Sequence, residues 1–323
     1  MTLNRWSISE ALSLTLGLMF LFVTSSPAQS ISGGASLRGL VMVEGLGVAG
    51  ATVELHRVTP STSGVVNQTT SRPGGIFEFR LPPVDTVGFT VFFATAEYQG
   101  VRYFGRPLHP GDDAEEYRVI AYDTTSTPQT PVRISRRDMV LLPQQDGSWE
   151  VNEILRLLNP GTHTVVSASG MPIIQIDLPT DAVAFEAGDG DAPAEQVQRM
   201  GDRVLLLSPV IPGERELFFR YRLASRPAST QLTISAVADS FNMFVRQPAP
   251  HLTVEGLSPS EIIQVEGERF LQYSTSSDVQ LRNLSLQWRG SNASPVSPVA
   301  AAIAISLVLL TVGGVAAYRN RPS

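Results

Sequence analysis

The histidines are the first residues of this chain to test for metal-binding or catalytic chemistry. There are four, and none has the HxH or HExxH spacing that brings two imidazoles to one metal ion. They occur one at a time, at His56, His109, His163 and His251. This pattern favours isolated surface or strand histidines, so we expect no metal site formed by them.

Carboxylates are the second group to consider, because oxygen donors bind Ca²⁺. The segment Gly188-Asp189-Gly190-Asp191, with Glu186 and Glu195 nearby, is the best candidate for a Ca²⁺ loop in the sequence. Glycine and aspartate also favour tight turns, and a turn between two strands is the interpretation we prefer. The sequence leaves open whether Asp189 and Asp191 bind Ca²⁺.

A second acidic cluster lies in a polar stretch and lacks the spaced D-x-D-x-D-G order of a known Ca²⁺ loop. Its members are Asp112, Asp113, Glu115 and Glu116. Runs of like charge are usually solvated, and we predict a surface loop here.

Several classes of enzyme are excluded by composition. All 24 basic residues are arginine, so there is no lysine for a Schiff base or a Walker-type phosphate site, and there is no cysteine for thiol catalysis. Ser167-Ala168-Ser169-Gly170 lacks the first glycine of a nucleophile elbow, and no strand-to-helix pattern surrounds it. We predict no catalytic, cofactor-binding or metal-binding residues, no cofactor, and a protein that is not an enzyme.

Aromatic side chains are the remaining candidates for binding. Tyr98, Tyr103 and Phe104 could form a platform for a carbohydrate or a protein, although packing in a core explains them equally well. Three N-x-S/T sequons matter only in a eukaryotic secretory pathway. They begin at Asn67, Asn283 and Asn292.

The C-terminal end of the chain contains a predicted membrane span. Residues 298–318 carry no charge, and 21 residues at a rise of about 1.5 Å form a helix of about 31 Å, long enough to cross a bilayer. Arg319 and Arg321 follow at once, which places the tail, 319–323, in the cytoplasm. Everything before the span is then expected on the other side of the membrane.

Residues 1–28 have the pattern of a secretory signal peptide. A short region with Arg5 is followed by an apolar run and by Ser26-Pro27-Ala28, with small residues at the positions that precede a cleavage site after Ala28. The alternative is an uncleaved N-terminal anchor. In either case the domains that follow are exported.

Charge and cysteine content narrow the environment and the partners. The net charge is −6 and the arginines are dispersed, so no basic face for nucleic acid is predicted. An exported domain without any cysteine depends on its cores rather than on disulfides, which suits a bacterial envelope.

The first predicted domain, 33–122, reads as a small β-sandwich, because apolar and polar residues alternate along its strands. A polar loop is expected over Thr59–Gln68. Strands are expected at Leu37–Val43, Ala51–His56, Ile76–Pro82 and Phe89–Ala94.

The glycines and apolar residues of this domain follow the order Gly39-x-Val41, Gly50-Ala51-x-Val53-x-Leu55, a Thr-containing polar loop, Gly75-x-Phe77-x-Phe79 and Leu81-Pro82. This order resembles the carboxypeptidase regulatory-like domain, a transthyretin-like seven-stranded sandwich. The resemblance covers roughly 75 of the 323 residues. It implies an accessory folding or binding module and transfers no catalytic residue.

The rest of the exported region also has β character. After a polar linker, 123–131, residues 132–226 fit a sandwich of the immunoglobulin or fibronectin III kind, with strands such as Trp149–Leu158 and Leu217–Leu223. Residues 227–290 are a further β segment that either closes this sandwich or forms a separate unit. Residues 291–297 are a Ser/Pro stalk.

These predictions combine into an all-β ectodomain of tandem antiparallel β-sandwiches with one C-terminal transmembrane helix. We expect a single-pass protein of the bacterial inner membrane, with a periplasmic ectodomain that binds or scaffolds a protein partner. One alternative is a carbohydrate or cell-wall binding module, which would show an aromatic row on an exposed sheet face.

The other alternative is an accessory subunit of an inner-membrane complex of the cytochrome-maturation or electron-transport type. The span itself would then make the contact, because its small residues allow close helix packing. These residues are Ala300, Ala301, Ala302, Ala304, Gly313, Gly314 and Ala316.

Overall fold

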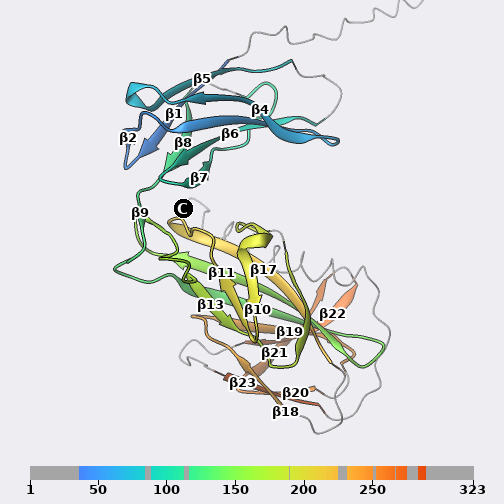
Figure 1. Cartoon of the computed structure of the whole chain (residues 1–323). Helices are drawn as coiled ribbons and strands as arrows, with labels where there is room; N and C mark the ends of the chain where they lie inside the picture. The colour runs from blue at the N-terminus through green and yellow to red at the C-terminus, as the bar shows by residue number, and fades with distance from the viewer. Residues whose placement is uncertain are drawn as a thin grey trace, which may run out of the picture.

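The computed structural model describes residues 36–83, 89–112, 116–188, 190–224, 231–249, 252–265, 267–274 and 283–288. Within them the chain consists of β-strands, with two short 3-10 helices, η1 (Pro73–Gly75) and η2 (Ala194–Gln196). The prediction of an all-β protein is therefore confirmed. The strands form two units, which lie one above the other in Figure 1.

The predicted signal peptide, stalk, transmembrane helix and cytoplasmic tail all lie outside the described residues. In the part of the chain that is described, no helix has the length and apolar character needed to span a bilayer.

The first unit packs two four-stranded sheets face to face. In one sheet β1 pairs with β2, β5 and β8, and the other sheet has the order β4-β3-β6-β7. The first sheet contains β1 (Ser36–Val43), β2 (Leu46–Gly47), β5 (Ile76–Arg80) and β8 (Tyr117–Ala121). The second contains β3 (Thr52–Val58), β4 (Ser63–Thr70), β6 (Val91–Tyr98) and β7 (Val101–Phe104).

Alternation along the strands creates the core of this unit. Leu37 and Val41 of β1, Val53 and Leu55 of β3, and Phe77 of β5 all point between the sheets. The pattern along β5 is alternately exposed and buried, as its sequence predicts.

A glycine-dependent corner joins the two sheets. Gly75 has a positive φ of 78°, and a Cβ atom at this position would lie 2.3 Å from the carbonyl oxygen of Val41. Beside it, the buried Ser71 hydroxyl donates to the carbonyl of Val48 at 2.7 Å and accepts from the Ala51 amide at 2.9 Å. Close backbone approach here admits only glycine.

The polar loop expected over Thr59–Gln68 is confirmed only for its first four residues, because Ser63–Thr70 form strand β4. β4 lies at the edge of its sheet and is exposed on both sides, so burial imposes no alternation on its sequence. Its pairing with β3 makes it a strand, and this pairing is a tertiary feature.

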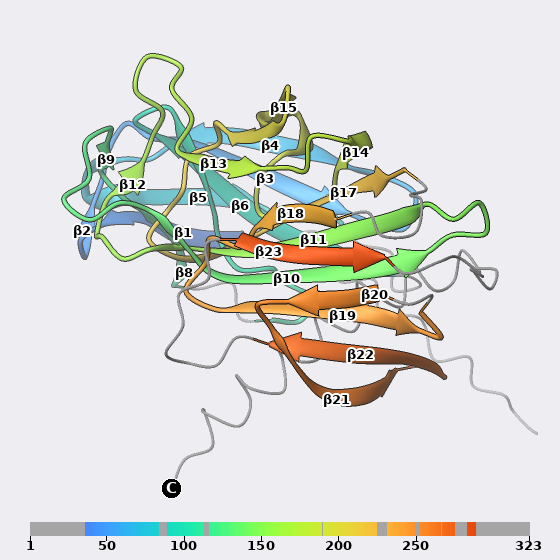
Figure 2. The same cartoon turned by 90° about the horizontal axis from the view of Figure 1, so that it is seen from below.

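The second unit is built on a seven-stranded sheet with the order β14-β17-β11-β10-β19-β22-β21. The part from β10 to β21 can be followed in Figure 2. Its strands are β10 (Arg133–Pro143), β11 (Trp149–Asn159), β14 (Ala182–Ala187), β17 (Gly213–Leu223), β19 (Phe241–Gln247), β21 (Ser258–Val265) and β22 (Glu268–Ser274).

Two three-stranded sheets cover one face of the large sheet and share its core. One has the order β13-β16-β15, with β13 (Ile174–Asp177), β15 (Val197–Met200) and β16 (Arg203–Leu206). The other has the order β18-β23-β20, with β18 (Gln231–Ser235), β20 (Leu252–Glu255) and β23 (Asn283–Trp288). The strands after residue 230 thus enter both layers and belong to one core with those before it.

Neither unit is purely antiparallel, in contrast to the expectation. β8 pairs with β1 in parallel, and β19 pairs with β10 in parallel. Each of these strands reaches its partner after the chain has passed through the opposite layer, so that it enters in the same direction as its neighbour.

The segment between the units is tied to both. β9 (Thr124–Thr125) pairs with β12 (Thr164–Val165) of the second unit, and the Thr124 amide donates to the side chain of Gln99 in the first. The buried Tyr103 hydroxyl donates to the Tyr122 carbonyl at 2.8 Å and lies 2.9 Å from the Thr164 hydroxyl. These hydrogen bonds connect the segment between the units to strands of both units.

Candidate functional site

An aromatic row crosses the outer face of the sheet β4-β3-β6-β7. His56 of β3 stacks on Phe93 of β6, with parallel rings whose centroids are 4.8 Å apart, and Phe93 lies 6.1 Å from the ring of Phe104 on β7. Val65 of β4 faces His56 in the strand register and extends the row. Phe104 is 66% exposed and Val65 is 51% exposed. We call Phe104, Phe93, His56 and Val65 the aromatic row.

The register of the strands produces this row. His56 lies opposite Phe93, and Thr95 lies opposite Phe104, so residues from three segments of the chain meet on one face. Side chains directly or diagonally opposite each other on neighbouring strands are within contact distance.

Polar groups flank the row on one side. The carboxylate of Glu54 lies 3.5 Å from both His56 Nε2 and Arg102 Nη2, and His56 Nε2 lies 3.1 Å from the Thr95 hydroxyl. Burial lowers the pKa of His56, and the carboxylate of Glu54 only partly offsets this. The imidazole is therefore neutral near pH 7, which makes the centre of the row an apolar stacking surface.

The three aromatics singled out from the sequence do not form a common platform. Phe104 is exposed in the row, whereas Tyr103 is 2% exposed and fills the core. Tyr98 donates to the carboxylate of Asp123 at 2.9 Å. Adjacent residues of a strand point to opposite faces, so the spacing of Tyr103 and Phe104 already contained this result.

The other histidines are placed as isolated groups. His109 lies 3.5 Å from Asp112, and His163 contacts the hydroxyl of Thr162 at 3.1 Å. His251 lies outside the described residues. No cluster of three or more histidine, aspartate or glutamate residues suited to a metal ion occurs in the described ranges.

The candidate Ca²⁺ segment is only partly described, because Asp189 lies outside the described residues. Asp191 accepts a hydrogen bond from the backbone N–H of Glu216 at 2.8 Å, and Glu186 pairs with Arg220. Glu195 lies in η2. Of the other acidic cluster, Asp113 and Glu115 also lie outside the described residues.

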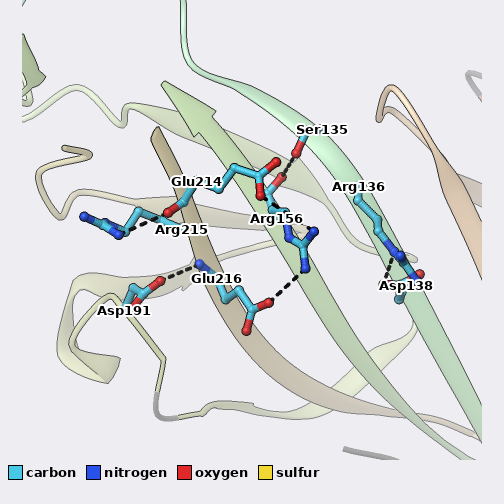
Figure 3. A network of polar contacts seen from close by, with 8 residues as sticks. All are labelled: Ser135, Arg136, Asp138, Arg156, Asp191, Glu214, Arg215 and Glu216. Carbon is cyan, nitrogen blue, oxygen red and sulfur yellow. Dashed lines mark hydrogen bonds and ion pairs between the residues drawn. The ribbon is translucent and has the colours of Figure 1, made fainter. Parts of the chain in front are cut away.

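Asp191 belongs to a charged network on the face of the seven-stranded sheet away from its main core (Figure 3). Arg156 contacts Glu216 at 3.3 Å and Glu214 at 3.6 Å, and Arg136 donates to Asp138 at 2.7 Å. Each charge in these contacts has an opposite charge beside it. Arg156 makes cross-strand ion pairs between β11 and β17, whereas Arg136 and Asp138 pair along β10, and these contacts explain the network as sheet stabilisation.

The serine segment has no nucleophile geometry. Ser167 donates to the carbonyl of Met171 at 2.7 Å, and Ser169 adopts a positive φ of 49°. The segment follows β12 as a turn, not as a strand entering a helix.

A buried polar cluster lies inside the second unit. Arg137 donates to Glu153 through Nε at 2.6 Å and through Nη2 at 2.9 Å, and Tyr221 donates to the same carboxylate at 3.0 Å. Arg137 also donates to the carbonyl of Ser235 at 2.8 Å, which links the two layers. The side chains of Arg137 and Glu153 are 1% and 0% exposed, so a substrate does not reach them.

The comparisons with known proteins leave the family open. No family model and no curated protein matches the sequence. Among solved structures, an M1 zinc metallopeptidase from Deinococcus radiodurans is similar at 15% identity and a TM-score of 0.30, over 49% of this chain and 43% of that one.

A two-domain M1 zinc metallopeptidase bound to L-tryptophan is similar at 13% identity and a TM-score of 0.31, again over 49% of this chain and 43% of the other. This chain therefore spans less than half the length of these neighbours. Likeness at this level carries no argument about fold or activity.

Proposed function

We propose that this chain is a non-catalytic binding protein of the bacterial envelope, exported by residues 1–28 and held at the inner membrane by residues 298–318. The aromatic row is its contact surface for a protein partner. The support for this surface is the large exposed area of Phe104 beside the stacked pair Phe93 and His56.

Exposed apolar side chains gain free energy when a partner removes them from water, and this favours the aromatic row as a contact surface. Aromatic side chains contribute strongly to interface energies, because each buries a large area at a small loss of conformational freedom. The alternating pattern of β7 buries Tyr103 in the core and leaves Phe104 on the outer face, so Phe104 takes no part in the packing between the two sheets. The polar groups of Glu54 and Arg102 beside the row supply directional contacts at its rim.

The test compares what the full-length chain captures from detergent-solubilised envelopes with what a Phe93→Ala/Phe104→Ala variant captures. Leu46→Ala is the matched control, since Leu46 is 73% exposed and lies on the opposite sheet. Loss of two aromatic anchors is expected to weaken binding at least about thirtyfold, at more than about 1 kcal/mol each. Equal capture by both variants would show that the row is not the contact surface.

A version ending at Ser294 separates the accessory-subunit alternative from this proposal. If the partner is captured only when residues 298–318 are present, the membrane span makes the contact. Capture that survives truncation but needs Phe93 and Phe104 supports the ectodomain surface.

The aromatic row also favours carbohydrate as a second candidate ligand, because an exposed row on a sheet face is the feature that this alternative requires. Binding of cell-wall glycan fragments to the full-length chain, measured by calorimetry, tests it. Saturable binding that disappears in Phe104→Ala and persists in Leu46→Ala would replace the protein partner by a glycan.

A further inference from the structure

Strand β4 leaves one side of its sheet open. It pairs with β3 and with no other described strand. Its residues are exposed along the whole length except Thr69, which is half-buried. The unpaired N–H and C=O groups of such an edge are a template for another strand.

The composition of β4 lacks the protection that long edge strands usually carry, namely charge or proline. Of the described edge strands longer than five residues, β14 contains Glu186 and β21 contains Pro259 and Glu261. β4, with the sequence SGVVNQTT, contains neither a charge nor a proline. This edge is therefore the one among them that is suited to strand pairing.

A bulge limits which part of β4 can pair regularly with a further strand. The register with β3 shifts between Asn67 and Val65, while Asn67–Thr70 remain regularly paired with Thr52–Leu55. In this half the Gln68 N–H already donates to the side-chain oxygen of Asn67 at 2.8 Å, so pairing with a further strand has to replace that local bond.

We propose that β4 pairs antiparallel with β4 of a second copy of this chain, about a two-fold axis perpendicular to the sheet. An uncharged strand meets itself without any like-charge contact, and the amides of Asn67 and Gln68 both donate and accept, so the surface is self-complementary. Pairing with a strand of another protein would not require β4 to be complementary to itself, and for this reason the self-complementarity favours a second copy as the partner.

The pairing joins two four-stranded sheets into one sheet of eight strands. A two-fold axis perpendicular to the sheet keeps both outer faces on the same side, and Val65 places the β4 end of each aromatic row next to the junction. The two rows then form one platform across both copies. The pairing stands on β4 alone, whereas the shared platform rests on the proposed function.

Cysteine scanning tests the pairing directly, because the chain contains no cysteine of its own. Single substitutions along Ser63–Thr70 of the full-length chain are oxidised mildly in the membrane. A disulfide needs Cβ atoms within about 3.5 to 4.5 Å, and symmetric antiparallel pairing brings a residue this close to its own copy only beside the axis. We expect one position, the residue that faces its own copy at the axis, to cross-link, and Ile120→Cys on β8, an exposed residue, to remain monomeric.

A charge on the edge provides the second measurement. Gln68→Lys is expected to raise the dimer Kd about tenfold or more, because like charges meet across the interface. The control Ile120→Lys places the same charge on β8 and should leave the Kd unchanged. Sedimentation of the full-length protein in mild detergent gives both values, and thermal unfolding checks that each variant is folded.

Three outcomes overturn the proposal. The first is a chain that stays monomeric and cross-links at no position of β4. The second is equal cross-linking at all positions of β4, which indicates parallel pairing. The third is cross-linking to a different protein. None of these depends on Phe93 or Phe104, so failure here is distinguishable from failure of the proposed binding surface.

Discussion

Replacing Glu153 by glutamine is expected to destabilise the second unit strongly. The substitution keeps the shape of the side chain but removes the negative charge that pairs with Arg137. Burial opposes the charge on Arg137, and Glu153 more than offsets this, so that the pKa of Arg137 is raised. Without that carboxylate the guanidinium is a buried charge with no counter-charge in hydrogen-bonding contact among the described residues.

The magnitude follows from the complete burial of the pair, whose side chains are 1% and 0% exposed. Removing one partner of a buried ion pair costs about 3 to 5 kcal/mol. In a unit of this size that corresponds to a fall in Tm of about 6 to 20 °C. Burial and the charge of Glu153 hold the pKa of Tyr221 well above its ordinary value, so the phenol is a neutral donor at every pH of interest.

Urea unfolding followed by tryptophan fluorescence is a suitable assay, since Trp149 is buried in the same core. Tyr221→Phe, which removes one hydrogen bond to the carboxylate, should cost about 1.5 to 3 kcal/mol. The double variant Arg137→Met/Glu153→Leu should be more stable than Glu153→Gln, because no charge remains buried. The exposed pair of Arg38 and Glu78 provides the surface control, and Arg38→Gln should cost less than about 1 kcal/mol.

Two results would refute this reasoning. One is a Glu153→Gln variant within about 1 kcal/mol of the parent, which would mean that water or structural relaxation neutralises the buried guanidinium. The other is a double variant that loses as much stability as the single one, which would assign the loss to packing rather than to charge.

Three further predictions concern the first unit and the junction. Gly75→Ala should prevent stable folding of the first unit, with loss of cooperative unfolding in calorimetry, because the added Cβ would lie 2.3 Å from a carbonyl oxygen. His56 has a pKa below its ordinary value of 6.5, so at pH values below 6.5 the unfolded chain binds more protons than the folded chain, and the free energy of unfolding declines. His56→Gln should reduce this decline when unfolding is compared at pH 7.5 and pH 5.5. Tyr103→Phe should cost about 1 to 3 kcal/mol in urea unfolding, since the hydroxyl of Thr164 and the carbonyl of Tyr122 lose a partner.

The alternation of apolar residues was sufficient to predict the β character and the inward faces of several strands. Along β17 the residues Leu217, Phe219, Tyr221 and Leu223 are buried, as their spacing of two indicates. Burial of one face imposes that pattern on a sequence, so the strands that enclose a core can be predicted from the sequence alone.

The features that matter most for binding depend on contacts between distant segments. β4 is a strand because it pairs with β3, and no burial pattern marks it in the sequence. His56, Phe93 and Phe104 meet because the register of three strands brings them together, and sequence spacing carries no information about register between strands.

The same distinction applies to the charged groups. Arg137 and Glu153 are spaced by two from buried apolar residues of their own strands, such as Met139 and Leu155, so alternation places both on the core face. Their pairing with each other, and the bond from Arg137 to the Ser235 carbonyl of β18, depend on the tertiary structure. The sequence by itself determined which residues belong to strands and which face of most strands is apolar. The tertiary structure decided which exposed residues gather into a surface and which buried charges pair with each other, because both depend on which strands lie side by side.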